Sequence, residues 1–236
     1  YEKDLVSIIS KNRKFKKPPV LMLSGGVDSM MLGTILKYKD TQFDVVVLSK
    51  GGDFDESTAD SRNQECKNVW KNIDNLNGIF IDSKFIKDKK EDMWTNILEK
   101  KLNIENYDCI FSTSTDDSHF EHRMVSELPF VLARRTKCGI IQYKSPSTLD
   151  NWVPNFFVDL NVINKRKVDE GHSEETNRLF LACVWYIKLN KLKLFDSQKD
   201  KSYFSKQSLE SFHSNYQCSM RGMNTVESFK IIRSYN

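Results

Sequence analysis

The stretch from Pro18 to Gly33, PPVLMLSGGVDSMMLG, constrains the fold more than any other part of the chain. It opens with a continuous apolar run, Val20 to Leu23, which is typical of a buried strand in a parallel sheet. Ser24, Gly25 and Gly26 then predict a turn, because glycine adopts backbone conformations that other residues avoid. After the turn, apolar residues recur at helical spacing. The stretch therefore predicts a strand, a turn and a helix in direct succession.

This succession creates an anion-binding site at the amino terminus of the helix. The first backbone N–H groups of a helix have no partner within it, and they lie at the positive end of the helix dipole. Phosphate is the usual occupant of such a site. Asp28 and Ser29 stand at the helix start, where a carboxylate can hold Mg²⁺ against phosphate and a hydroxyl can donate to it.

Further apolar segments predict more strands of the same sheet, at residues 43–49, 78–81, 109–111 and 139–143. Helical patterns separate them, including those at residues 57–72 and 93–102 and one that carries Phe120, Met124 and Leu128. Alternation of this kind implies right-handed crossovers. We therefore expect an α/β fold, with a parallel sheet of about five strands and helices on both faces.

The carboxyl-terminal part has a different pattern. From Ser173 on, helical segments follow one another, and the last is predicted at residues 223–232 from an apolar residue at every third position. The division predicted on this basis is an α/β domain over residues 1–171 and a helical appendage over residues 172–236.

The string SGGVDS, between its strand and its helix, resembles the signature of the N-type ATP pyrophosphatases, the PP-loop family. It lacks the lysine of the Walker loop and the spaced glycines of the dinucleotide-binding fingerprint. The resemblance covers about residues 18–171, and it implies an adenine nucleotide alpha hydrolase-like, Rossmann-like domain. The nearest members are 7-cyano-7-deazaguanine synthase-like and tRNA lysidine synthetase-like enzymes.

The resemblance also implies roles for individual residues. Catalysis would depend on Asp28, Asp117 and Lys165, with Lys167 as the alternative lysine, and Asp28 and Asp116 would hold the metal. The residues implied to bind ATP lie in the glycine turn and at two strand ends: Ser24, Gly25, Gly26, Val27, Ser29, Leu48, Ser49 and Ser112.

Several of these positions also have a purely structural interpretation. Thr115 or Asp116 could cap the following helix, and Lys165 could belong to a solvated basic turn. His119 and His122 lie one helical turn apart, but no third metal ligand stands at a suggestive spacing. They are therefore interpreted as residues of the helix surface.

The activity that the resemblance implies is an ATP-dependent, AMP-forming ligation. A carboxylate or carbonyl oxygen attacks the α-phosphorus of ATP, pyrophosphate leaves, and a nitrogen nucleophile displaces AMP. The acceptor would be a small molecule or a nucleobase, as in 7-deazaguanine (queuosine-type) synthesis, and a homodimer or a nitrogen-donor subunit is an expected partner. One alternative is a tRNA-modifying enzyme of the lysidine synthetase or thiouridylase type. Another is a catalytically silent nucleotide-binding module.

Composition adds expectations about cofactors and location. ATP and Mg²⁺ are the expected cofactors, and zinc is not expected, because the five cysteines form no CxxC pair. Odd and widely spaced cysteines favour reduced thiols. The longest apolar run, at residues 179–187, is about half of a membrane span. The sequence thus predicts a cytoplasmic protein without a membrane partner.

Overall fold

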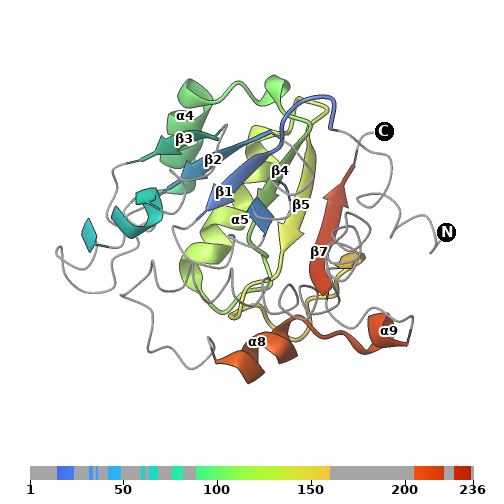
Figure 1. The fold of residues 1–236 in the computed structure, drawn as a ribbon. Coiled ribbons are helices and arrows are strands. Elements are labelled where there is room, and N and C mark those ends of the chain that lie inside the picture. The colour runs from blue at the N-terminus through green and yellow to red at the C-terminus, as the bar shows by residue number, and fades with distance from the viewer. Residues whose placement is uncertain are drawn as a thin grey trace, which may run out of the picture. The chain divides into compact units, whose positions relative to one another are not determined.

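The computed structural model describes residues 15–23, 32–33, 36, 42–48, 60–61, 64–68, 76–81, 89–159, 205–220 and 226–234. Its elements are shown in Figure 1 and are, in chain order, β1 (Val20–Leu23), β2 (Phe43–Val47), β3 (Leu76–Phe80), α4 (Glu91–Lys101), the short 3-10 helix η3 (Ile104–Asn106), β4 (Cys109–Ser112), α5 (Phe120–Leu132), β5 (Gly139–Tyr143), β6 (Phe156–Asp159), α8 (Lys206–Phe212), α9 (Tyr216–Ser219) and β7 (Val226–Arg233).

The strands form one sheet with the order β3-β2-β1-β4-β5-β7-β6. Neighbouring strands from β3 to β5 are all parallel, whereas β7 pairs with β5 in the antiparallel direction. The predicted α/β class and its five parallel strands are confirmed. The prediction of a purely parallel five-stranded sheet is wrong, because the sheet has seven strands and is mixed.

The strand β7 replaces the helix that was predicted at residues 223–232. Its sequence, VESFKIIR, is rich in β-branched and aromatic residues, which favour strands. Without β7, the edge of β5 would expose a row of unpaired backbone groups. The three-residue spacing of apolar side chains was therefore a misleading signal, because pairing with a distant strand decided the conformation.

The chain divides into two compact units. The main unit comprises Lys14–Pro154 and Phe229–Asn236, and the second comprises Tyr1–Arg13 and Asn155–Ser228. The predicted boundary at residue 171 stays a prediction, because residues 160–204 lie outside the described part of the chain.

In the second unit, a small apolar cluster joins Cys218 and Val226 with Phe157. Nearby along the chain, the buried His213 ring places Nδ1 3.1 Å from Oε2 of the buried Glu227. The backbone N–H of Val226 also donates to the carbonyl of His213 at 2.8 Å. These contacts tie the residues after α8 to the start of β7.

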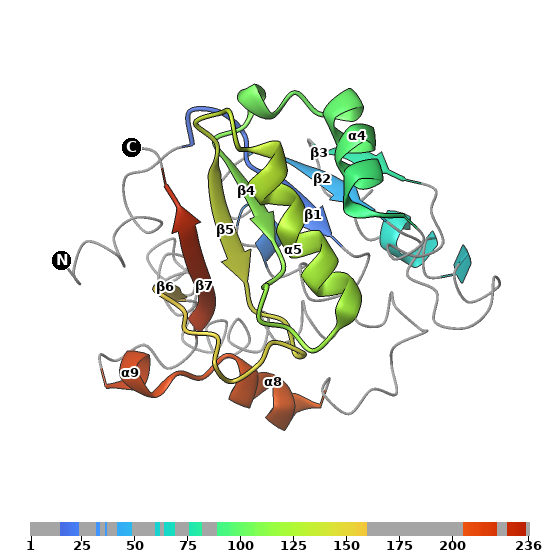
Figure 2. The same cartoon turned by 180° about the vertical axis from the view of Figure 1, so that it is seen from behind.

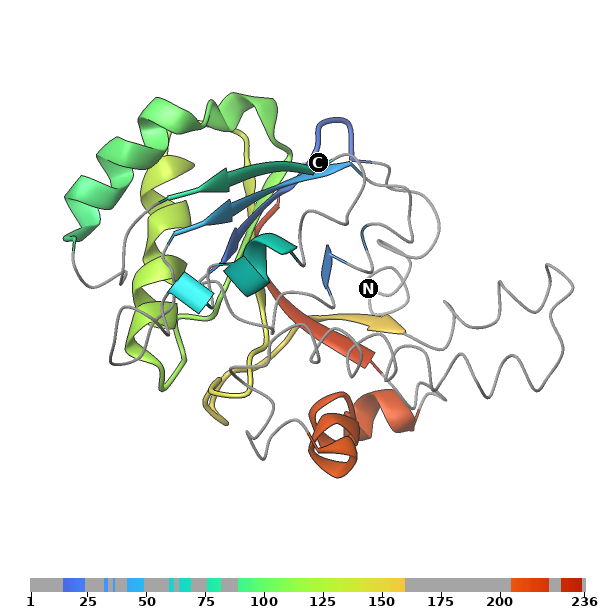
Figure 3. The same cartoon turned by 60° about the vertical axis from the view of Figure 1, so that its left-hand side comes forward.

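The core of the main unit lies between the sheet and two helices. Both α4 and α5 lie on the same side of the strands, and α5 runs across β4 and β5 (Figures 2 and 3). Trp94 and Leu98 of α4 are completely buried in this core, together with Ile110 of β4. Alternate residues of the parallel strands therefore face the helices, which fixes the register of the sheet.

The loops that follow β4 and β5 lie at the same edge of the sheet, because parallel strands end on the same side. In open α/β sheets this carboxyl edge is where ligands bind. The two loops touch through a bridge between Asp117 and Thr148. The fold thus places the predicted Asp117 against a segment about thirty residues further along the chain.

Two findings concern thiols and membranes. Cys109 and Cys138 are free and buried, and burial, the largest cause, raises the pKa of the Cys138 thiol to about 12. A helix with the length and apolar character that a bilayer crossing requires is not found in the described part of the chain.

We expect Phe229→Ala to destabilise the protein by about 3–5 kcal/mol, as is usual for a buried aromatic residue. The Phe229 side chain is completely buried, and its ring makes a T-shaped contact with that of Phe111, with centroids 6.1 Å apart. Ile232→Ala is the matched control, because Ile232 lies on the same strand but is 38% exposed. Chemical denaturation measures both; equal effects would contradict the assignment of Phe229 to the core.

Candidate functional site

Two loops form the candidate site at the carboxyl edge of the sheet, one at residues 113–119 and one at residues 144–149. Two backbone hydrogen bonds of 2.9 Å connect them. The N–H of Ser118 donates to the carbonyl of Ser147, and the N–H of Leu149 donates to the carbonyl of Asp116. Two loops with shared backbone hydrogen bonds behave as one rigid element. Side chains on either loop are therefore held in fixed relative positions.

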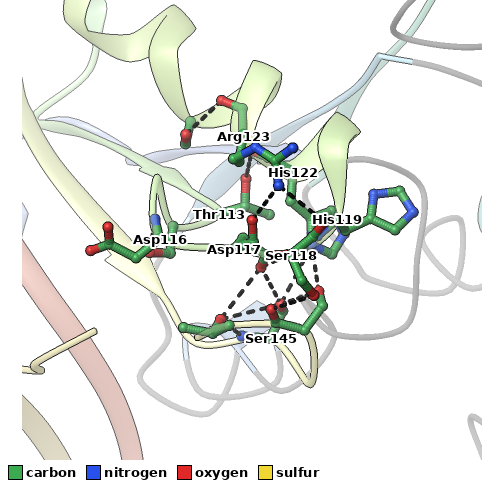
Figure 4. Close-up of polar contacts among 12 residues, drawn as sticks. Thr113, Asp116, Asp117, Ser118, His119, His122, Arg123 and Ser145 are labelled. Atoms are coloured by element: carbon green, nitrogen blue, oxygen red, sulfur yellow. Dashed lines mark hydrogen bonds and ion pairs between the residues drawn. The ribbon is translucent and has the colours of Figure 1, made fainter. Parts of the chain in front are cut away.

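Asp117 is the centre of this site (Figure 4), and its side chain is completely buried. One carboxylate oxygen, Oδ1, accepts the backbone N–H of His119, the residue directly before α5, at 2.8 Å. The other, Oδ2, accepts the hydroxyl of Ser145 at 2.6 Å and lies 3.1 Å from Nδ1 of His122. The N-cap residue of α5 is His119, and no side chain makes a capping hydrogen bond there, so neither Thr115 nor Asp116 caps this helix.

His122 lies in the first turn of α5 and is 7% exposed, so its interpretation as a surface residue is wrong. Its Nδ1 is 3.1 Å from both Oδ2 of Asp117 and Oγ of Ser147. An ionised carboxylate only accepts hydrogen bonds, so the neutral ring carries its proton on Nδ1. Its Nε2 has no hydrogen-bond partner within the described part of the chain, which leaves a lone pair for substrate or metal.

Burial alone would raise the pKa of the Asp117 carboxyl. Hydrogen bonds, chiefly from His122 and Ser145, and the electrostatic attraction of the His122 ring outweigh burial and lower this pKa well below its usual value. The carboxylate is therefore ionised at neutral pH and can stabilise a positive charge on the His122 ring.

The site is not a serine nucleophile triad, although it contains serine, histidine and aspartate. In such triads the hydroxyl meets the imidazole nitrogen opposite the one that binds the carboxylate. Here the Ser145 hydroxyl donates to the carboxylate itself and lies 3.4 Å from Nδ1, the nitrogen that also faces Asp117. Ser145 is thus placed to hold Asp117, while Nε2 is the nitrogen of His122 that these contacts leave available.

His119 and Arg123 complete the surroundings of the pair. The His119 ring lies beside that of His122, with centroids 4.5 Å apart, and is exposed, as the sequence predicts. The Arg123 guanidinium donates to the backbone carbonyls of Asp117 and Ser118, so it braces the loop from outside.

Most of the predicted ligand residues cannot be located. Those of the glycine turn (Ser24, Gly25, Gly26, Val27, Asp28 and Ser29), together with Ser49 and Lys165, lie outside the described residues. Leu48 and Ser112 are completely buried at the ends of β2 and β4. Asp116 is one-third exposed, and its Oδ2 lies 3.5 Å from Nζ of Lys230 on β7.

Sequence reasoning identified Asp117 but missed His122, Ser145 and Ser147. One signal for His122 was available: an aspartate that accepts the N–H of the residue two positions on, just before a helix, also lies near side chains of the first helical turn. No local signal marks the two serines, because only the pairing of β4 with β5 brings them to Asp117.

The donor set for a metal is incomplete in the described part of the chain. No group of three or more His, Cys, Asp or Glu side chains there could hold a metal ion. Among the described residues, His122 fits the chemistry of a zinc ligand, because a carboxylate holds its second nitrogen, as is usual for metal-bound histidines. Catalytic zinc takes three protein ligands, so no complete zinc site can be assigned from these residues.

No protein-family model matches this sequence, and no characterised protein matches it by sequence. Solved structures with the same fold do exist. GalB, the 4-carboxy-2-hydroxymuconate hydratase of Pseudomonas putida, has a TM-score of 0.63 and 12% identity, over 93% of this chain and 97% of its own.

Two deacetylases are also similar. The N,N'-diacetylchitobiose deacetylase of Pyrococcus horikoshii has a TM-score of 0.56 and 17% identity, over 98% of this chain and 91% of its own. The zinc-inhibited form of the teicoplanin deacetylase Orf2 has a TM-score of 0.55 and 8% identity, over 92% of this chain and 99% of its own. At these identities the similarity establishes a common fold.

These neighbours correct the family prediction. A hydratase and deacetylases share the fold, not PP-loop ATP pyrophosphatases, so the assignment to that family is wrong. The predicted ATP-dependent, AMP-forming ligase activity and the link to queuosine synthesis are wrong with it. The physical reason is that a strand, a glycine turn and a helix occur in many α/β folds, so a six-residue string carries little information about chemistry.

The cofactor prediction is also wrong. ATP and Mg²⁺ were expected and zinc was not, yet a deacetylase of this fold has been captured in a zinc-inhibited form. The absence of a CxxC pair was a poor guide, because histidine and carboxylate ligands bind zinc without any cysteine.

We expect Asp117→Asn to destabilise the protein at neutral pH by an amount that shrinks in acid. The pKa of this carboxyl is lower in the folded state than its unfolded value of about 3.9. The ionised carboxylate therefore stabilises the fold fully at a pH above its unfolded-state pKa. This stabilisation is lost as the pH falls from the unfolded-state pKa toward the folded-state pKa. Denaturation of both proteins at about pH 7 and about pH 3 measures the difference; a difference that does not change with pH would contradict this role of Asp117.

Proposed function

We propose that this chain is a hydrolase that removes an N-acyl group, such as acetyl, from a small-molecule amine of the amino-sugar type. One observation carries the proposal: a buried Asp117–His122 pair at the carboxyl edge of the sheet leaves Nε2 of His122 available. The two deacetylases of the same fold support it, one acting on N,N'-diacetylchitobiose and one on teicoplanin.

Amide hydrolysis needs a group that can take a proton from water and return it to the leaving amine. An imidazole held through one nitrogen by a carboxylate can do both with its other nitrogen. In this site Asp117 orients the ring and stabilises the imidazolium that forms when Nε2 takes the proton. His122 is the proposed catalytic base and acid, and Asp117 is its positioning partner.

A bound zinc ion, where present, would polarise the amide carbonyl and lower the pKa of water. Since the described residues supply no complete donor set, the proposed steps involve only His122 and Asp117. Asp28 stands in a segment outside the described residues and stays a predicted metal ligand.

Hydration of a carbon–carbon double bond is a second candidate, which the likeness to the hydratase GalB favours. Both reactions add water to a trigonal carbon, and both need a group that moves a proton. They differ in product, because only hydrolysis releases a carboxylic acid and an amine.

The sequence also predicts a small-molecule substrate, and the present proposal keeps that prediction. Binding of tRNA and formation of a homodimer stay predictions. A cytoplasmic location is likewise proposed, and the free, buried thiols of Cys109 and Cys138 support it.

The direct test is to incubate the protein with N-acetylglucosamine and N,N'-diacetylchitobiose, with added zinc and with a chelator, and to measure acetate and free amine. We expect equal amounts of both products. A parallel incubation contains a conjugated dienoate, and its consumption without any deacylation of the amino sugars would favour hydration instead. Turnover of neither substrate class under any metal condition would contradict the proposal.

The proposed roles can be tested in the same assay. We expect His122→Gln and Asp117→Asn each to lower kcat/KM by about a hundredfold or more, because each disables the proton-transferring pair. Glu127→Gln is the control, since Glu127 is an exposed carboxylate on the same helix, α5. A wild-type rate in the His122 variant would show that the chemistry lies elsewhere.

A further inference from the structure

The hydroxyls of Ser145 and Ser147 form an ordered chain around the Asp117–His122 pair. The Ser145 hydroxyl lies 2.6 Å from Oδ2 of Asp117 and 3.0 Å from the hydroxyl of Ser147. Ser147 in turn lies 3.1 Å from Nδ1 of His122. The loop after β5 therefore reaches both members of the pair.

The direction of each hydrogen bond follows from counting protons. A hydroxyl has one proton to donate, and an ionised carboxylate has none. Ser145 gives its proton to the carboxylate, which is its shortest contact, so Ser147 must be the donor between the two serines. Ser147 then has only lone pairs left to face His122, and both neighbours of Nδ1 can only accept.

We propose that Ser145 is a positioning residue that preserves the tautomer of His122 set by Asp117, with the proton on Nδ1 and the lone pair on Nε2. Ser145 does this indirectly. Its hydroxyl oxygen accepts the only proton of the Ser147 hydroxyl, so Ser147 has no proton left to donate to Nδ1 of His122. The consequence for catalysis rests on the proposed function, whereas the tautomer itself does not.

This proton count makes an unusual prediction for single and double variants. In Ser145→Ala, the hydroxyl of Ser147 loses its acceptor and becomes able to donate to Nδ1, so part of the His122 population should move its proton to Nε2. In the double variant Ser145→Ala/Ser147→Ala, that donor is gone as well, and the Nδ1–H form should return. Loss of structure alone would not be reversed by removing a second hydroxyl.

The matched control is Ser126→Ala. Ser126 is completely buried on α5, and its hydroxyl makes one hydrogen bond of 2.6 Å to the carbonyl of Arg123. This variant removes a buried serine hydroxyl with the same bond length as that of Ser145, but it leaves the chain of contacts around Asp117 intact. Any difference between the two variants therefore reports on the pair itself.

The experiment is ¹⁵N NMR of the histidine rings at about pH 8, where the imidazole of an ordinary histidine is neutral. The chain has 4 histidines, and His122→Gln assigns the signal of interest. Wild type and Ser126→Ala should show protonated Nδ1, Ser145→Ala should shift toward the mixture, and the double variant should shift back. In the deacylation assay, kcat of Ser145→Ala should fall about fivefold with KM nearly unchanged, on the scale of one hydrogen bond.

Each outcome decides a separate question. Protonated Nε2 in the wild type would overturn the proposal without any variant, and so would identical spectra for Ser145→Ala and Ser126→Ala. If Ser145→Ala does not fold, Ser147→Ala replaces it and should keep protonated Nδ1; a shift toward Nε2 would overturn the proposal. Expected spectra without deacylation would refute only the proposed function.

Discussion

The hydrogen bond between Asp117 and His122 is the interaction on which the candidate site depends. Removing a carboxylate from water is costly unless its oxygens find partners. Here the cost is offset by the backbone N–H of His119, the hydroxyl of Ser145 and the His122 ring. Those partners come from α5, the loop before it and the loop after β5, which meet because β4 and β5 are parallel neighbours. The site therefore exists only in the folded sheet, and breaking such a buried pair typically costs about 3–5 kcal/mol.

Much of the fold could be predicted from local pattern. Continuous apolar runs such as Val20 to Leu23 mark strands that are buried on both faces, and that signal needs no knowledge of distant residues. The prediction failed at β7, where apolar residues at every third position suggested a helix. An antiparallel strand added at the edge of a parallel sheet is decided by its partner, β5, and not by its own periodicity.

The site was less predictable than the fold. Asp117 could be found because it follows a strand at the ligand-binding edge. His122 was misread as a surface residue, since helical spacing shows which residues share a face but not that a carboxylate of the preceding loop covers one of them. The string SGGVDS led to the wrong chemistry, because local geometry at a strand–helix turn is common to folds with unrelated activities.

The central claim is that Nε2 of His122 is the position that meets the substrate. Crystals soaked with acetate and glucosamine, the products of the proposed reaction, test it most directly. We predict acetate with an oxygen within hydrogen-bonding distance, about 3 Å, of Nε2, while Nδ1 still faces Asp117. A structure in which Nε2 is covered by protein, or in which the products bind away from His122, would contradict the claim.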